Sequence, residues 1–168
     1  MPGPVLWLLR HGKAAEPLAD GDAARPLTER GEAQSVEVGH LLKTLAPTLS
    51  AVITSPRVRA LRTAELAVQA HGSAPDPLIF DELGGDYTLD DLLVLTSPWL
   101  GFDDEPDGPG SIERDDHEPP AVLVVGHNPT LTVIAHQLTG DERGMKTGTI
   151  VGVDLASREL VAHITPDA

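Results

Sequence analysis

The sequence predicts an α/β fold, a three-layer sandwich in which helices flank a mostly parallel central sheet. Two observations lead to this prediction. Short apolar runs alternate along the chain with longer segments whose apolar residues recur at helical spacing. The chain has 168 residues, of which 40% are apolar, enough for one domain with its own core. We therefore expect residues 1–168 to form a single domain.

Six apolar runs are predicted to be strands. The run VLWLL at Val5–Leu9 is apolar at every position, as expected of a strand that is buried on both faces of a sheet. The clearest later run is AVLVV at Ala121–Val125. The last two runs are expected to close the sheet as a pair. The remaining four runs are Ala51–Thr54, Leu78–Phe80, Ile150–Leu155 and Leu160–Ile164.

Four helices are predicted between these strands. Thr28 can cap a helix that runs to about Leu45, and Pro47 ends it. Gly72 and Gly140 stand just past two other helical segments, where glycine commonly ends a helix. The four predicted helices span residues 28–45, 56–70, 89–95 and 129–138.

The charge of the chain is negative and uneven. Twelve basic and 26 acidic residues give a net charge of −14, which argues against general affinity for nucleic acid or for an anionic membrane. Residues 101–120 hold eight acids, one arginine, four prolines and three glycines, a composition that predicts a mobile, solvated loop. The rest of the chain is only mildly acidic and can host a locally basic site.

Composition and the N-terminal sequence exclude further classes. The absence of cysteine excludes disulfides, thiolate metal sites, iron–sulfur clusters and cysteine nucleophiles. Aromatic residues make up only 3% of the chain, too few for platforms on which nucleic-acid bases stack. The N-terminal apolar run is too short for a signal peptide or a membrane span. We therefore expect a soluble, cytoplasmic protein.

Polar residues that suit anion binding follow three of the predicted strands. They are Arg-His-Gly at 10–12, Ser-Pro-Arg-Val-Arg at 55–59 and Gly-His-Asn-Pro at 126–129. In a mostly parallel sheet the carboxyl ends of the strands meet at one edge, where binding sites form. Ser55 and Asn128 are good N-cap residues, each followed by a proline, so two helix N-termini are expected at this edge. The three strand ends together predict a phosphate pocket.

Residue spacing alone leaves the choice of arginine open. Arg57 and Arg59 are two residues apart, so on a helix they do not face the same way, whereas Arg59 and Arg62 can share a face.

The three strand-end motifs resemble those of the histidine phosphatase superfamily, which also contains the cofactor-dependent phosphoglycerate mutases. The motifs are residues 9–12 (LRHG), residues 55–63 (SPRVRALRT) and residues 126–129 (GHNP). A further stretch, residues 22–31 (DAARPLTERG), is similar to the short SixA-type phosphohistidine phosphatases. The resemblance extends over about residues 5–135 and implies a phosphoglycerate mutase-like fold.

The resemblance implies a role for each residue that matches a motif. His11 corresponds to the nucleophile that becomes phosphorylated, and Arg10 and Arg59 to the arginines that clamp the phosphoryl oxygens. His127 corresponds to the second histidine of the pocket. Gly12 and Asn128 are expected to lie against the phosphate as well. Arg57 and Arg62 are left with rim or structural roles.

An acidic residue just past the third predicted strand is the candidate proton donor. Glu82 stands where many members of the family carry an acid, and Asp81 and Asp86 are the alternatives. A labile phosphohistidine substrate would depend less on this proton. The chain has neither an HExxH motif nor a P-loop, so neither a metal nor another cofactor is expected.

These residues together predict a metal-independent phosphatase that forms a phosphohistidine on His11 and then hydrolyses it. The favoured reading is a SixA-type enzyme acting on phosphohistidine in a phosphorylated protein. The first alternative is a phosphatase of small-molecule phosphoesters on the same fold, and the second is a non-catalytic phosphate-recognition module. A third class, a metallohydrolase with His11 and His127 as ligands, is kept for comparison.

Overall fold

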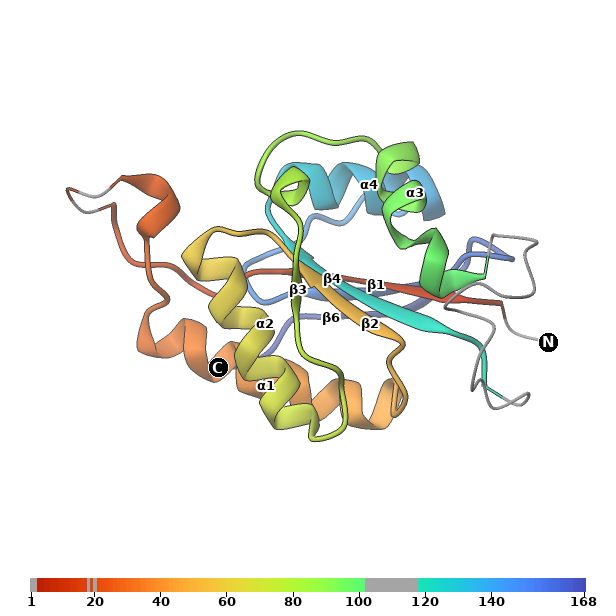
Figure 1. Ribbon diagram of the computed structural model, residues 1–168, viewed down its shortest axis with the longest axis horizontal. Helices are drawn as coiled ribbons and strands as arrows, with labels where there is room; N and C mark the ends of the chain where they lie inside the picture. Colours follow the sequence, from red (N-terminus) through yellow and green to blue (C-terminus); the bar gives the residue numbers. More distant parts are fainter. Residues whose placement is uncertain (1–2, 18, 20, 102–117) are drawn as a thin grey trace.

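A computed structural model describes residues 3–17, 19, 21–101 and 118–168, which form an α/β fold around one six-stranded sheet (Figure 1). The strands are β1 (Val5–Arg10), β2 (Ala51–Thr54), β3 (Leu78–Ile79), β4 (Ala121–Gly126), β5 (Ile150–Asp154) and β6 (Leu160–Ile164). The predicted acidic loop at 101–120 lies largely outside the described residues.

The sheet has the strand order β3-β2-β4-β1-β5-β6. The first four strands in this order pair in parallel, and β5 is antiparallel to both of its neighbours, β1 and β6. The prediction of a mostly parallel sheet is thus confirmed. Because β1 and β4 are neighbours in the middle of the sheet, the residues that follow them come out side by side at its carboxyl edge.

Helices cover both faces of the sheet, so the predicted three layers are confirmed. The α helices are α1 (Glu29–Leu45), α2 (Val58–His71), α3 (Leu89–Leu100) and α4 (Thr130–Thr139), and two short 3-10 helices are η1 (Asp22–Ala24) and η2 (Asp81–Gly84). Figure 1 shows α1 and α2 against one face of the sheet and α3 and α4 against the other.

Strand β1 is buried on both faces, as its apolar run predicts. Leu6 and Leu8 pack with α3 and α4 in one cluster, and Trp7 and Leu9 pack with α1 and α2 in the other. All four side chains are at most 1% exposed. The alternation of side chains along a strand therefore divides one apolar run between two cores.

The structure corrects two predicted helix starts. Helix α2 begins at Val58 with Arg57 as its N-cap, and α4 begins at Thr130 with Pro129 as its N-cap, so neither Ser55 nor Asn128 is the cap residue. The reason is local: the Ser55 side chain accepts a hydrogen bond from the Arg57 backbone N–H and forms a turn before the helix. The predicted Thr28 cap of α1 is confirmed, since its side chain accepts from the Gly31 backbone N–H.

Helix α3 is longer than predicted and runs past Pro98 to Leu100. A proline inside a helix leaves the carbonyl four residues earlier without its usual donor. Here the Ser97 hydroxyl donates to that carbonyl, of Val94, at 2.9 Å. The third predicted strand is shorter than expected, with only Leu78 and Ile79 paired. No helix of the described residues has the length and apolar character needed to cross a bilayer.

Candidate active site

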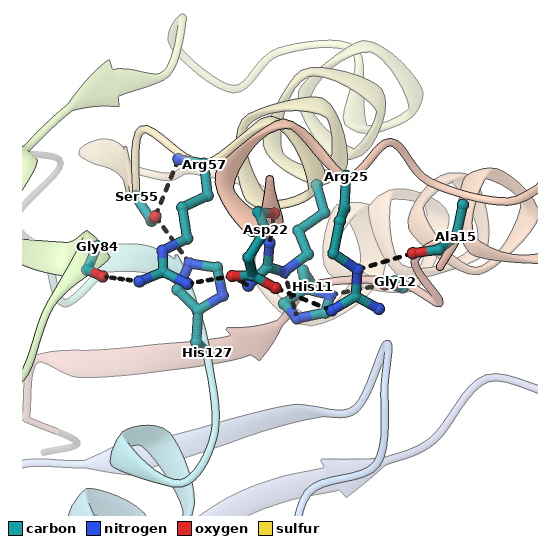
Figure 2. Close-up of polar contacts among 10 residues, drawn as sticks. His11, Gly12, Ala15, Asp22, Arg25, Ser55, Arg57, Gly84 and His127 are labelled. Atoms are coloured by element: carbon teal, nitrogen blue, oxygen red, sulfur yellow. Dashed lines mark hydrogen bonds and ion pairs between the residues drawn. The ribbon is translucent and has the colours of Figure 1, made fainter. Parts of the chain in front are cut away.

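The three predicted strand ends converge at the carboxyl edge of the sheet. Arg10 pairs with Gly126 at the ends of β1 and β4, so His11 and His127 follow neighbouring strands. The two imidazole rings are 5.2 Å apart between centroids. Arg59, on the first turn of α2, donates from its Nε to Nε2 of His11. Figure 2 shows His11 and His127 side by side at this edge. The sequence-predicted residues His11, Arg59 and His127 therefore share one site.

Two hydrogen bonds fix the imidazole of His11. Its Nδ1 donates to the Gly12 carbonyl oxygen at 2.7 Å, because a carbonyl can only accept. Its Nε2 accepts from Nε of Arg59 at 3.3 Å. Both contacts require the same tautomer, with the proton on Nδ1 and the lone pair on Nε2. His11 is only 7% exposed, and Nε2 is the atom available for attack.

The surroundings of His11 keep its imidazole neutral. Burial is the main cause that lowers its pKa to about 4, and the cations of Arg59 and Arg10 act in the same direction. The Gly12 hydrogen bond opposes this shift without cancelling it. At neutral pH the imidazole is therefore uncharged, with no proton on Nε2, and can act as a nucleophile.

Gly12 holds the segment after β1 against the two helices beneath it. Its backbone N–H donates to the Thr63 hydroxyl at 3.0 Å, and that hydroxyl donates to the Arg59 carbonyl at 2.7 Å. A Cβ on Gly12 would collide with the Gly31 carbonyl, and a Cβ on Gly31 would collide with the Lys13 carbonyl. Glycine is needed at both positions because the two backbones touch. This contact is the structural role that the structure shows for Gly12.

Three arginines contact the carboxylate of Asp22, on η1. Figure 2 shows two of them, Arg25 and Arg57, on either side of it. Arg57 donates to its Oδ2 at 2.7 Å, Arg59 to the same oxygen at 3.1 Å and Arg25 to its Oδ1 at 3.2 Å. The pKa of Asp22 is lowered, first by the hydrogen bond from Arg25. Sequence reasoning included Asp22 and Arg25 in a motif but assigned neither to the site. Their spacing within residues 22–31 was the available signal.

The expectation that Arg57 and Arg59 diverge is wrong. Arg57 is not helical: it is the N-cap of α2, with extended backbone at φ −63° and ψ 138°. Its side chain therefore turns back toward Asp22 and also donates to the Gly84 carbonyl at 2.8 Å. Arg62, by contrast, stands 3.9 Å from Glu32 and is about half exposed.

His127 is held by Ser55, which was expected only to cap a helix at this edge. Its Nε2 lies 2.8 Å from Oγ of Ser55, a fully buried serine at the end of β2. Its Nδ1 is buried and has no hydrogen-bond partner within the described residues. Burial above all lowers the pKa of His127 to about 3, and His11 and Arg59 add to the shift. This imidazole is therefore also neutral at neutral pH.

Arg10 and Asn128 meet at one carbonyl of the loop before β5. The Met145 carbonyl accepts from Nη1 of Arg10 and from Nδ2 of Asn128, both at 2.8 Å. The Asn128 Oδ1 accepts from the Thr132 hydroxyl at 2.9 Å. The predicted phosphate contact of Asn128 stays a prediction, since the structure shows its side chain tying this loop to α4.

Glu82 lies on η2 and is exposed, unlike the buried groups of the site. It lines a pocket of about 530 Å³ together with Asp81, Asp86, Asp91 and Tyr87. No hydrogen bond found among the described residues joins its side chain to His11, Arg59 or His127. A second pocket, of about 590 Å³, lies beside Arg10 and Asn128 and includes Lys146.

The site as a whole is suited to a tetrahedral anion. It combines a neutral nucleophilic nitrogen with the buried guanidinium group of Arg59 and the half-buried one of Arg10. In the part of the chain that the structure describes, no three His, Asp or Glu side chains are arranged to hold a metal ion.

Comparisons with known proteins point to one family. The model of the histidine phosphatase superfamily (branch 1) matches residues 6–83. An uncharacterized protein of Picosynechococcus sp. is 33% identical over 166 residues, which cover 94% of this chain and 89% of that protein. A 2,3-bisphosphoglycerate-dependent phosphoglycerate mutase of Caulobacter sp. (strain K31) is 40% identical over 81 residues, which are 46% of this chain and only 34% of the mutase.

The fold is also found in solved structures of other proteins. The crystal structure of the putative phosphohistidine phosphatase SixA from Agrobacterium tumefaciens superposes with a TM-score of 0.75 at 22% identity, over 99% of both chains. The predicted phosphoglycerate mutase-like architecture is thereby confirmed. The family match, which includes the His11 and Arg59 motifs, and the shared fold together show that the chain belongs to the histidine phosphatase superfamily, branch 1.

Proposed function

We propose that this chain is a phosphatase that transfers a phosphoryl group first to His11 and then to water. One observation carries the proposal: Nδ1 of His11 donates to the Gly12 carbonyl, which leaves the lone pair on Nε2, beside Nε of Arg59. A neutral imidazole held in this tautomer is a nucleophile that needs no base to activate it.

The reaction has two displacement steps. In the first, Nε2 of His11 bonds to phosphorus while the bond to the leaving group breaks, and the leaving group departs with its electron pair and takes up a proton. In the second, a water oxygen bonds to phosphorus, the nitrogen–phosphorus bond breaks and His11 recovers its lone pair. Glu82 is the proposed proton donor for leaving groups that need one, and its carboxylate or solvent takes the proton that the water loses. Inorganic phosphate is then released.

The charge that develops on the phosphoryl oxygens would be stabilised by groups already in place. Arg59 is only 5% exposed and its Nε already faces the attacking atom. Arg10 is held by the Met145 carbonyl beside His11. Phosphoryl transfer depends mainly on such positioning and charge stabilisation, so no step of this mechanism requires a metal.

Within this activity we propose a protein phosphohistidine as the substrate. The Asp22 side chain at the site is 49% exposed, so the anion-binding groups lie close to the surface, where a loop of another protein can reach them. The likeness in fold to SixA extends over the whole chain, which supports the same substrate class. The second candidate is a small phosphoester, favoured by the pocket of about 590 Å³ that adjoins Arg10.

Trapping of the intermediate tests the mechanism. We expect label from a ³²P-phosphorylated histidine carrier protein to appear on the wild type after a rapid alkaline quench, and to be absent from His11→Ala. His40→Ala, at an exposed histidine of α1, is the matched control and should be labelled like the wild type. Equal labelling of His11→Ala would rule out His11 as the nucleophile.

The same assay separates the substrate candidates. We expect kcat/KM for the phosphorylated carrier protein to exceed that for every member of a panel of sugar phosphates. A preference for a sugar phosphate by orders of magnitude would favour the small-phosphoester reading. Loss of activity in a strong chelator would instead point to a metallohydrolase.

A further inference from the structure

The second histidine of the site has one ring nitrogen with a partner and one without. Nε2 of His127 is 2.8 Å from Oγ of Ser55, whereas Nδ1 is buried and has no partner among the described residues. Buried polar groups are almost always paired, so an unpaired one at a site indicates a role. The protonation of Nδ1 decides what that role can be, because a protonated nitrogen donates and an unprotonated one repels an anion.

The hydrogen bonds of Ser55 assign the proton. Oγ of Ser55 accepts from the Arg57 backbone N–H at 3.2 Å, and its hydroxyl has a single proton to donate. If that proton goes to Nε2 of His127, both atoms of the 2.8 Å contact are satisfied and Nδ1 carries the ring proton. The tautomer of a histidine is set in this way by the partner of its other nitrogen.

The opposite tautomer leaves more groups unsatisfied. Nε2 of His127 would then donate to Ser55, and the serine proton would need another acceptor. No such acceptor is found for this hydroxyl among the described residues, and Ser55 is fully buried. Two groups would remain unpaired, the serine proton and the Nδ1 lone pair, instead of the Nδ1 proton alone.

The unpaired nitrogen faces the nucleophile. Figure 2 shows the His127 ring with one edge toward Ser55 and the other turned toward Asp22 and His11. The ring centroids of His11 and His127 are 5.2 Å apart, so a phosphoryl group bonded to Nε2 of His11 would bring an oxygen near Nδ1 of His127. A donor at this point would match the charge that develops on that oxygen.

We propose that Ser55 is a positioning residue that holds His127 as the Nδ1–H tautomer, so that the neutral ring donates a hydrogen bond to a phosphoryl oxygen above His11. The inference rests on the proposed function, because it requires a phosphoryl group in this pocket. The tautomer itself, however, is a property of the free protein and can be measured without any substrate.

The first test is long-range ¹H–¹⁵N NMR of the full chain, with the His127 signals identified by their loss in His127→Gln. We expect Nδ1 to be protonated and Nε2 to be unprotonated in the wild type. In Ser55→Ala the Nε2–H form should become populated, while Ser55→Thr, which keeps the hydroxyl, should retain the wild-type pattern. Ser35→Ala is the control, because Ser35 is equally buried but donates to the Gly31 carbonyl.

The second test is binding of inorganic phosphate, followed by ³¹P NMR or calorimetry. We expect Kd to rise about tenfold or more in Ser55→Ala, the effect of losing a hydrogen bond to a charged group. Ser35→Ala and Ser55→Thr should bind like the wild type.

The outcomes separate the two proposals. A wild-type ring protonated on Nε2 would overturn the role of Ser55, and this spectrum decides the point even if Ser55→Ala fails to fold. A wild type that is protonated on Nδ1 but binds no phosphate would contradict the proposed function and the donor role of His127 while leaving the tautomer assignment intact. An unchanged Kd in folded Ser55→Ala would likewise overturn the donor role.

Discussion

The two walls of the site differ in how completely their polar atoms are paired. The nucleophile wall consists of His11, Gly12, Arg59 and Thr63, and each of its buried polar side-chain atoms has a partner within the protein. The second wall consists of Arg10, Ser55 and His127. It contains two buried side-chain nitrogens, Nε of Arg10 and Nδ1 of His127, that have no partner among the described residues.

This difference indicates a division of labour between the walls. The nucleophile must already be in its reactive tautomer when the substrate arrives, and a fully paired network holds it there. The groups that stabilise charge in the transition state should find their best partner only then. The second wall meets that requirement if its unpaired nitrogens donate to phosphoryl oxygens of the substrate. Breaking the nucleophile wall should therefore cost activity most.

Replacing Arg59 should have the largest effect. Arg59→Lys removes the Nε donor that faces His11 and the two further contacts to Asp22, and lysine cannot reproduce this planar arrangement. We expect kcat/KM to fall by about 10²–10³-fold, the usual cost of one lost donor to a developing charge. Steady-state kinetics on a phosphorylated substrate would measure it.

Arg62→Lys is the matched control on the same helix. Arg62 is about half exposed and stands 3.9 Å from Glu32, so this substitution should leave kcat/KM unchanged. If both variants kept wild-type kinetics, Arg59 would have no part in presetting the nucleophile wall.

A smaller effect is expected from the packing beneath the nucleophile wall. In Gly31→Ala the new methyl group would meet the backbone of Lys13, so the segment after His11 must move. We expect the free energy of unfolding to fall by about 1–3 kcal/mol, as for overpacking in other cores. At about 2–4 °C per kcal/mol in a chain of this size, thermal unfolding would show the change clearly.

Gly85→Ala provides the comparison, because its Cβ would meet no atom within 4 Å and its φ of −115° suits any residue. We expect its melting temperature to stay within a degree or two of the wild type. Equal melting temperatures for the two variants would mean that the close approach of Gly31 to the Lys13 backbone does not constrain the segment after His11.

The two walls also differ in how far the sequence predicts them. The position of His11 follows from the apolar run of β1 and the motif at its end, and the Thr28 cap marks the start of the helix that packs beneath it. Each of these signals lies within a few consecutive residues, so it can be read from the sequence without knowing which distant segments come together. The same holds for Arg59, which the resemblance selects within a recognisable helix.

The missed contacts join segments that are far apart in the chain. Ser55 meets His127 across 72 residues, and Arg57 meets Asp22 across 35. Residue spacing carries no information on such pairs. The contact of Arg57 depends in addition on a helix that starts later than its proline suggests, which changed the direction of the side chain. The length of α3 escaped prediction for a related reason, because Ser97 compensates for Pro98.

The smallest expected effect is that of mild acid on the two imidazoles. Burial lowers the pKa of His11 to about 4 and that of His127 to about 3, so both rings should stay neutral between pH 7.5 and 5.5. Histidine with its ordinary pKa of about 6.5 would be about nine-tenths protonated at pH 5.5. We therefore expect the ring signals of both residues to stay constant over this range in an NMR titration, and the His11 signals to move only as the pH approaches 4.

The lowered pKa values of the two histidines also set the sign of the effect of acid on stability. Both pKa values are lower in the folded state than in the unfolded state, so the unfolded state binds more protons below about pH 6.5. The free energy of unfolding should therefore decrease as the pH falls from about 6.5 toward 4 while the imidazoles of the folded protein remain unprotonated. Titration of His11 near pH 6.5 would mean that water reaches its ring as freely as in a peptide. Neither burial nor Arg59 would then hold the nucleophile in its neutral form.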